Sequence, residues 1–96
     1  MAEVVYSPRA LHDLERLEDF LLEADLAAAR QIIPLITSAI EILRQHPKIG
    51  RPRAVILREL VISHGKSGYV ALYRYRESED VVRVLAFRHQ REVGGG

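Results

Sequence analysis

The spacing of apolar residues divides the chain into a helical first half and a β-rich second half. Between residues 8 and 46 the apolar positions recur at steps of three and four, which is the period of an amphipathic helix. From residue 55 onward, β-branched and aromatic residues gather in three runs that short polar segments separate. Because helical and strand patterns are segregated along the chain, the sequence predicts an α+β fold.

The first helix is predicted to follow a short strand at residues 3–6. Ser7 is a suitable N-cap, and Pro8 then takes the first helical position, where a missing N–H leaves no helical bond unmade. The apolar stripe consists of Ala10, Leu14, Leu17, Leu21 and Ala24. The acidic positions are Asp13, Glu15, Glu18, Asp19 and Glu23. We expect the stripe to face the core and the acidic residues to face solvent.

The second helix is predicted to begin after Asp25, which can cap it, and to end before His46-Pro47. Its apolar stripe consists of Leu26, Ala29, Ile33, Ile36, Ile40 and Leu43. Pro34 removes one backbone hydrogen bond, so we expect a kink there, with a break into two helices as the alternative. The two helices are expected to form an antiparallel hairpin.

Three strands are predicted over residues 55–63, 69–76 and 81–89, connected by two hairpin-sized segments. They form a three-stranded antiparallel sheet, with the N-terminal strand pairing at an edge. The helices cover one face, and the other face, partly polar, is left for a partner. Alternation places Phe87 on the face opposite Val82 and Val84. Residues 47–53 have turn chemistry and three positive charges, which indicates an exposed loop.

The composition describes a single domain that spans residues 1–96. With 48% hydrophobic residues the chain can bury one core but not two. The absence of cysteine excludes disulfides, thiolate nucleophiles and the usual structural zinc sites. Without an export signal or an apolar run long enough for a membrane span, we expect a cytoplasmic protein with no membrane partner.

The net charge of +1 conceals an uneven distribution of charge along the chain. Residues 1–48 contain 5 basic and 8 acidic residues, whereas residues 49–96 contain 9 basic and 5 acidic residues. Of the 14 basic residues 12 are arginine, whose planar guanidinium suits carboxylates and phosphates. The basic half therefore either binds an anion or presents an ordinary solvated surface.

The candidate chemistry is concentrated in the β-rich half. The four histidines lack metal-ligand spacing, no glycine-rich phosphate loop follows a strand, and no nucleophile has a recognisable base, so we expect neither a metal nor a cofactor. What remains is arginine interleaved with tyrosine, together with His89, which suits phosphate contact, base stacking and proton transfer during RNA cleavage. In the alternative interpretation the tyrosines belong to the core and the arginines pair with acidic residues such as Glu59.

The order of several short motifs resembles the RelE/ParE family of type II toxins over nearly the whole chain. The motifs are Tyr6-Ser7-Pro8-x-Ala10, Asp13-Leu14, Leu43-x-x-His46-Pro47-x-x-Gly50-Arg51-Pro52, Arg58-Glu59-Leu60-Val61-Ile62, Tyr69-x-x-Leu72-Tyr73-Arg74 and Val82-x-Val84-Leu85-x-x-Arg88-His89-Gln90-Arg91-Glu92. The resemblance implies a strand, a helical hairpin and an antiparallel sheet. It also implies a cognate antitoxin that wraps and neutralises the toxin.

The resemblance leaves two targets open, DNA gyrase for ParE-like members and messenger RNA at the ribosome for RelE-like members. For RNA cleavage it implies His89 as the acid, with Arg58, Arg74 and Arg83 holding phosphates. Contacts to the target are assigned to Arg88, Arg91, Tyr73 and Tyr75.

Two departures from the nuclease pattern and one resemblance to the ParE-type branch favour gyrase. One nuclease branch has glutamate at the position of Arg53 and arginine at that of Val70, and the ending Arg88–Gly94 looks like the ParE-type plasmid-stabilisation branch. We therefore expect a non-enzymatic, ParE-like toxin, with RNA cleavage as the alternative and an inactive, antitoxin-binding member as a third interpretation.

Overall fold

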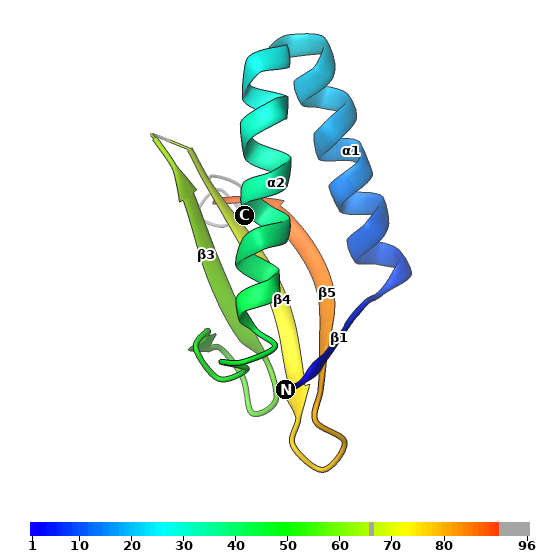
Figure 1. The fold of residues 1–96 in the computed structure, drawn as a ribbon, viewed down its shortest axis with the longest axis vertical. Coiled ribbons are helices and arrows are strands. Elements are labelled where there is room, and N and C mark those ends of the chain that lie inside the picture. The colour runs from blue at the N-terminus through cyan, green and yellow to red at the C-terminus, as the bar shows by residue number, and fades with distance from the viewer. Residues whose placement is uncertain (66, 91–96) are drawn as a thin grey trace.

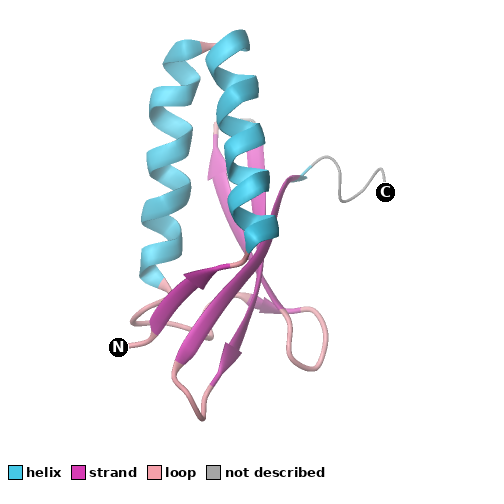
Figure 2. Ribbon diagram, turned by 90° about the vertical axis from the view of Figure 1, so that its right-hand side faces the viewer, coloured by secondary structure: helices cyan, strands magenta, loops and turns pink. Residues whose placement is uncertain are grey.

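The computed structural model describes residues 1–65 and 67–90, which form a helical hairpin packed on a five-stranded sheet. The elements are β1 (Glu3–Tyr6), α1 (Pro8–Ala24), α2 (Leu26–Ile42), β2 (Arg51–Pro52), β3 (Arg58–His64), β4 (Ser67–Arg76) and β5 (Val81–His89). Both helices lie on the same side of the sheet (Figure 1), where α1 packs against β5 and α2 against β3. Figure 2 shows the two helices side by side as a hairpin. Neither described helix is both long and apolar enough to cross a bilayer.

The sheet is mixed, with the strand order β1-β5-β4-β3-β2. The meander β3-β4-β5 is antiparallel, and β1 pairs in parallel with β5 at one edge, from Glu3 opposite Val81 to Tyr6 opposite Val84. This arrangement confirms the predicted α+β fold, the three-stranded antiparallel sheet and the N-terminal strand at its edge.

Two predicted boundaries between residues 47 and 63 are wrong. The segment expected to be only loop contains β2, which pairs with Arg58 and Glu59 of β3 and is too short to show a period in the sequence. The strand expected from Val55 begins instead at Arg58, because residues 54–57 form a tight turn. Val55 and Ile56 are β-branched, yet they lie exposed in that turn.

Both predicted helix caps are confirmed. The Ser7 hydroxyl accepts a hydrogen bond from the Ala10 N–H at 3.0 Å, and the Asp25 carboxylate accepts one from the Ala28 N–H at 3.1 Å. α2 stays one helix through Pro34, so the alternative of two separate helices is wrong. Ile36, Ile40 and other members of its apolar stripe are buried, whereas Leu26 at its start is exposed.

A β-bulge in β5 changes which side chains reach the core. Leu72 of β4 pairs with Ala86 and the next residue, Tyr73, pairs with Val84, so Leu85 is an extra residue. The insertion moves Phe87 to the same face as Val84, where it is buried and stacks on Tyr6. The prediction that Phe87 faces away from Val82 and Val84 is therefore wrong, because strict alternation assumes an uninterrupted ladder.

The beginning of α1 is hydrogen-bonded to β5 on both sides of this bulge. The Ser7 hydroxyl donates to the Leu85 carbonyl and the Ser7 N–H donates to the Val84 carbonyl, both at 2.9 Å. The Asp13 carboxylate accepts a hydrogen bond from the Phe87 N–H at 3.1 Å and another from the Arg9 guanidinium at 3.2 Å. Asp13 is only 8% exposed, so its predicted place on the solvent-facing side of α1 is wrong.

Substitution of Asp13 by Ala is expected to destabilise the protein by about 2 kcal/mol. The change leaves the buried Phe87 N–H without an acceptor, which in proteins costs roughly 1–3 kcal/mol. Asp19→Ala is the matched control, since Asp19 is an exposed residue of the same helix. Urea denaturation of the two variants checks the expectation, and equal midpoints would contradict the role assigned to Asp13.

Candidate functional site

The face of the sheet that the helices leave uncovered carries most of the candidate arginines. Residues that alternate with the core positions point to this face. On β4 and β5 the residues that point to the uncovered face include Arg74, Arg76, Arg83 and Arg88. The same face of β3 carries Glu59 and Val61. The uncovered face is therefore basic, as the charge of the C-terminal half predicted.

Glu59 lies at the centre of one group of arginines on this face. Its carboxylate accepts hydrogen bonds from Arg53 at 2.6 Å and from Arg88 at 2.8 Å, and Arg51 lies 3.7 Å from its other oxygen. Burial acts to raise the pKa of Glu59, but the hydrogen bonds and charges of Arg53 and Arg88 outweigh it and hold that pKa below its ordinary value. The Glu59 side chain, 10% exposed, is thus an internal counter-ion for these arginines.

Arg74 and Arg83 form a second group, which has no counter-ion of this kind. They lie directly opposite each other on β4 and β5. Within the described ranges, neither forms a hydrogen bond or an ion pair, whereas the neighbouring Arg76 lies 3.4 Å from Glu79. A small cavity of about 150 Å³ is lined by Arg74, Arg76, Glu79, Val81 and Arg83.

Arg58 and Tyr73 lie opposite each other on β3 and β4, and both hold the loop that follows α2. The Arg58 guanidinium donates to the carbonyls of Lys48 at 3.0 Å and Gly50 at 2.8 Å. The Tyr73 hydroxyl donates to the Pro47 carbonyl at 2.9 Å and accepts from the Gly50 N–H at 2.8 Å. Both side chains are therefore engaged in the fold.

Tyr73 is completely buried, so its assignment as a contact to a target is contradicted. Burial raises the pKa of its phenol above the ordinary value, which keeps the hydroxyl protonated and able to donate. A side chain at position 50 is excluded, because a Cβ there would lie 2.5 Å from the Tyr73 oxygen. The alternative interpretation, in which tyrosines belong to the core, is right for Tyr69 and Tyr73.

His89 lies on the helix side of the sheet, at the end of β5. Its ring makes an edge contact with Tyr69, with ring centres 5.2 Å apart, and it pairs with that residue across the sheet. It shares a cavity of about 490 Å³ with Arg16, Phe20 and Arg88, at the junction of α1 with β5. The structure thus brings His89 near Arg88 but places it on the opposite face of the sheet from Arg74 and Arg83.

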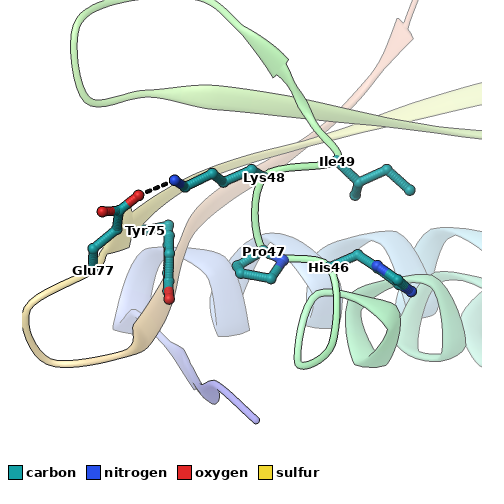
Figure 3. Close-up of a pocket in the computed structure, with 6 residues that line it drawn as sticks. All are labelled: His46, Pro47, Lys48, Ile49, Tyr75 and Glu77. Atoms are coloured by element: carbon teal, nitrogen blue, oxygen red, sulfur yellow. Dashed lines mark ion pairs between the residues drawn. The ribbon is translucent and has the colours of Figure 1, made fainter.

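Tyr75 lies at the other end of β4, beside the turn to β5. Its hydroxyl donates to the Asp80 carboxylate at 2.7 Å, and this hydrogen bond is the main cause that raises the pKa of Tyr75. The residue lines a shallow pocket of about 650 Å³ together with His46, Pro47, Ile49 and the ion pair of Lys48 with Glu77 (Figure 3). Arg91, the remaining predicted contact, lies outside the described residues.

Two residues with a decisive part in this arrangement were not predicted as functional. Glu59 was considered only as one of several possible partners for arginine, and Asp13 was assigned to solvent. In both cases the signal was a carboxylate within a segment that otherwise carries core residues, and only the tertiary structure shows its partners. Among the described residues no cluster of His, Asp or Glu could hold a metal ion.

Comparison with known proteins identifies the family. The sequence-family model for the ParE toxin of type II toxin–antitoxin systems (parDE) matches residues 4–94 of this chain. The chain belongs to this ParE toxin family. A curated relative, the toxin RelE3 of Caulobacter vibrioides, is 40% identical over 92 residues, which cover 96% of this chain and 98% of the relative.

Solved structures support the fold of this ParE-family chain. A chain of the chromosomal ParDE system of P. aeruginosa superposes with a TM-score of 0.78 and 18% identity, covering 93% of this chain and 96% of that one. A chain of the E. coli RelBE toxin–antitoxin complex superposes with a TM-score of 0.63 and 17% identity, covering 91% and 94% respectively. Both are similar to this chain in fold, and the protein is a type II toxin by family.

Tyr73→Phe is expected to destabilise this ParE-family protein by about 2 kcal/mol, because it removes the two hydrogen bonds that Tyr73 makes to the 47–50 loop and leaves the buried Gly50 N–H unpaired. Tyr75→Phe is the matched control, since it also deletes a tyrosine hydroxyl, but one whose hydrogen bond, to Asp80, is exposed to solvent. Thermal denaturation of both variants checks the expectation, and a Tyr75→Phe variant that is less stable than Tyr73→Phe would contradict it.

The lowered pKa of Glu59 predicts a loss of stability in acid. A folded pKa below the unfolded value of about 4.3 means that the contribution of Glu59 is complete above that value and is lost as the pH falls through the folded pKa. Between about pH 5 and pH 3 the unfolding free energy of Glu59→Gln should therefore change less than that of the unsubstituted protein. Glu79→Gln, at an exposed pair, should keep the original slope, and parallel curves for Glu59→Gln would refute the assignment.

Proposed function

We propose that this protein is the toxin of a type II pair, that a cognate antitoxin neutralises it, and that it inhibits growth by acting on DNA gyrase. Membership of the ParE toxin family supports the first part. The observation that supports the choice of target is the separation of the candidate nuclease residues between the two faces of the sheet. The protein would then act by binding its target and not by cleaving it.

RNA cleavage by the predicted residues would need a different arrangement. A general acid has to lie within hydrogen-bond reach of the reacting group, or one water away, while cationic groups hold the phosphate. Arg74 and Arg83 lie on the uncovered face, whereas His89 lies against Tyr69 on the helix side. Arg58 already donates to two backbone carbonyls. Among the predicted arginines that the structure describes, Arg88 alone shares a cavity with His89.

An antitoxin partner is supported by the structural neighbours, which were solved as a ParDE toxin–antitoxin system and as a RelBE toxin–antitoxin complex. The basic uncovered face also favours an acidic partner, since complementary charge speeds association and selects among partners. We therefore expect the neighbouring reading frame to encode a protein with an acidic, partly apolar segment.

Ribosome-dependent cleavage of messenger RNA is the alternative function. Its specific support is that relatives 40% and 39% identical to this chain carry the name RelE. In this alternative, His89 and Arg88 would act together in the cavity between α1 and β5. The arginines of the uncovered face would then bind the rest of the RNA.

Induced expression with two readouts separates the two functions. If gyrase is the target, the purified protein should block supercoiling by gyrase, transcripts should stay intact during growth arrest, and His89→Ala should remain toxic. If the protein cleaves RNA, transcripts should be cut, and His89→Ala should reduce cutting by roughly 10²–10⁴-fold, the usual contribution of a general acid.

Co-expression of the protein from the neighbouring reading frame is the control, because it should restore growth in either case. Normal supercoiling at a protein concentration that arrests growth would exclude gyrase as the target. Growth that continues despite expression of the folded, full-length protein would contradict the assignment as an active toxin.

A further inference from the structure

The arginines of the uncovered face differ in what neutralises them. Arg53 and Arg88 share the carboxylate of Glu59, and Arg76 lies beside Glu79. In the described part of the chain Arg74 and Arg83 form no ion pair of this kind, although Glu79 lines the same small cavity and pairs with Arg76. The protein therefore gives the arginines around this pair an ion-pair partner and leaves the pair itself without one.

The position of this pair is unfavourable for the isolated protein. Directly opposite residues on neighbouring strands have their Cβ atoms about 5 Å apart, and like charges at that separation destabilise a sheet. Arg74 is also half-buried between its neighbours, which weakens the screening of its charge by water. A bound anion between the two guanidinium groups would remove the repulsion, since each of them presents a planar fork to a carboxylate or a phosphate.

The surroundings of the pair favour a protein segment over a nucleic acid. Single-stranded RNA is usually held by aromatic side chains on which its bases stack. All six phenylalanine and tyrosine side chains lie on the helix side of the sheet or on α1, so none is available beside Arg74 and Arg83. On the uncovered face the uncharged neighbours of the pair are aliphatic, namely Leu72, Val81 and Ala86, and its charged neighbours are Arg76 and Glu79. Such a mixture of arginine and aliphatic side chains matches an acidic segment that also carries apolar residues.

From this geometry we propose that Arg74 and Arg83 form a clamp for the carboxylates of an acidic, partly apolar segment of a partner protein. The proposal rests on the proposed function, where the antitoxin is the partner, and it names the chemistry by which that partner is recognised. The segment lies on the uncovered face, with a carboxylate between the two guanidinium groups and apolar residues against Leu72 and Ala86. Binding replaces the repulsion between the arginines by two charge-assisted contacts.

The charge-reversal variant Arg83→Glu tests the clamp, because it should weaken binding without lowering stability. In the isolated full-length protein the introduced carboxylate would lie opposite Arg74, so the thermal midpoint should stay the same or rise. Binding of a synthetic peptide of alternating glutamate and leucine should weaken by about tenfold or more, since the variant repels the carboxylates. The protein from the neighbouring reading frame should lose affinity in the same direction.

Three controls make the result decisive. Arg30→Glu reverses the same charge at an exposed position of α2 and should leave peptide binding unchanged. A glutamine–leucine peptide should bind far more weakly than the glutamate–leucine peptide. Arg83→Gln, which adds no new charge, should also weaken binding, and it replaces Arg83→Glu if the latter does not fold.

Two results would overturn the proposal. Equal peptide affinity in Arg83→Glu and in the unsubstituted protein would show that the pair binds no carboxylate. Binding of a single-stranded RNA oligonucleotide that Arg83→Glu abolishes, with no binding of the acidic peptide, would assign the pair to phosphate instead. The growth assay keeps this outcome separate from the proposed function, because it uses the unsubstituted protein and does not depend on the clamp.

Discussion

The attachment of α1 to β5 determines which side chains of the last strand face the core and which face outward. Ser7 and Asp13 together bind three backbone groups of β5, at Val84, Leu85 and Phe87, on both sides of the bulge. Without the bulge, Phe87 would point away from Tyr6, and Arg88 would point toward the helices. The hydrogen bonds of α1 therefore support both the packing of the hairpin and the outward direction of Arg88.

The arginines of the sheet are of two kinds, those that are paired with a carboxylate and those that are not. Around Glu59 the charges are neutralised internally, which fixes Arg53 and Arg88 in the fold and makes them part of a stable network. At Arg74 and Arg83 the charges have no ion-pair partner among the described residues, at a cost in stability, which is the condition expected of a surface that is completed by a partner. For a toxin that is stored in neutralised form such a surface is an advantage, because the partner that inhibits the toxin also stabilises its folded state.

The elements of the fold could be predicted from local signals, whereas most of the site could not. The caps at Ser7 and Asp25, most of the apolar stripe of each helix and the bounds of β5 follow from period and side-chain chemistry, and they appear in the structure. The bulge at Leu85 and the burial of Asp13 depend on contacts more than 70 residues apart in sequence, which no local pattern contains. Tyr73 shows the same limit, because no local pattern indicates the loop that its hydroxyl holds.

Gly50 and Tyr73 lie 23 residues apart in sequence, but their contact makes the residue at one position depend on the residue at the other. Any side chain at position 50 would collide with the phenol ring, and any smaller residue at position 73 would leave the Gly50 N–H without its acceptor. A lineage that changes one of these residues is therefore under pressure to change the other. Among family members, the identity of residue 50 should report whether the loop after the second helix is held by a tyrosine or by some other means.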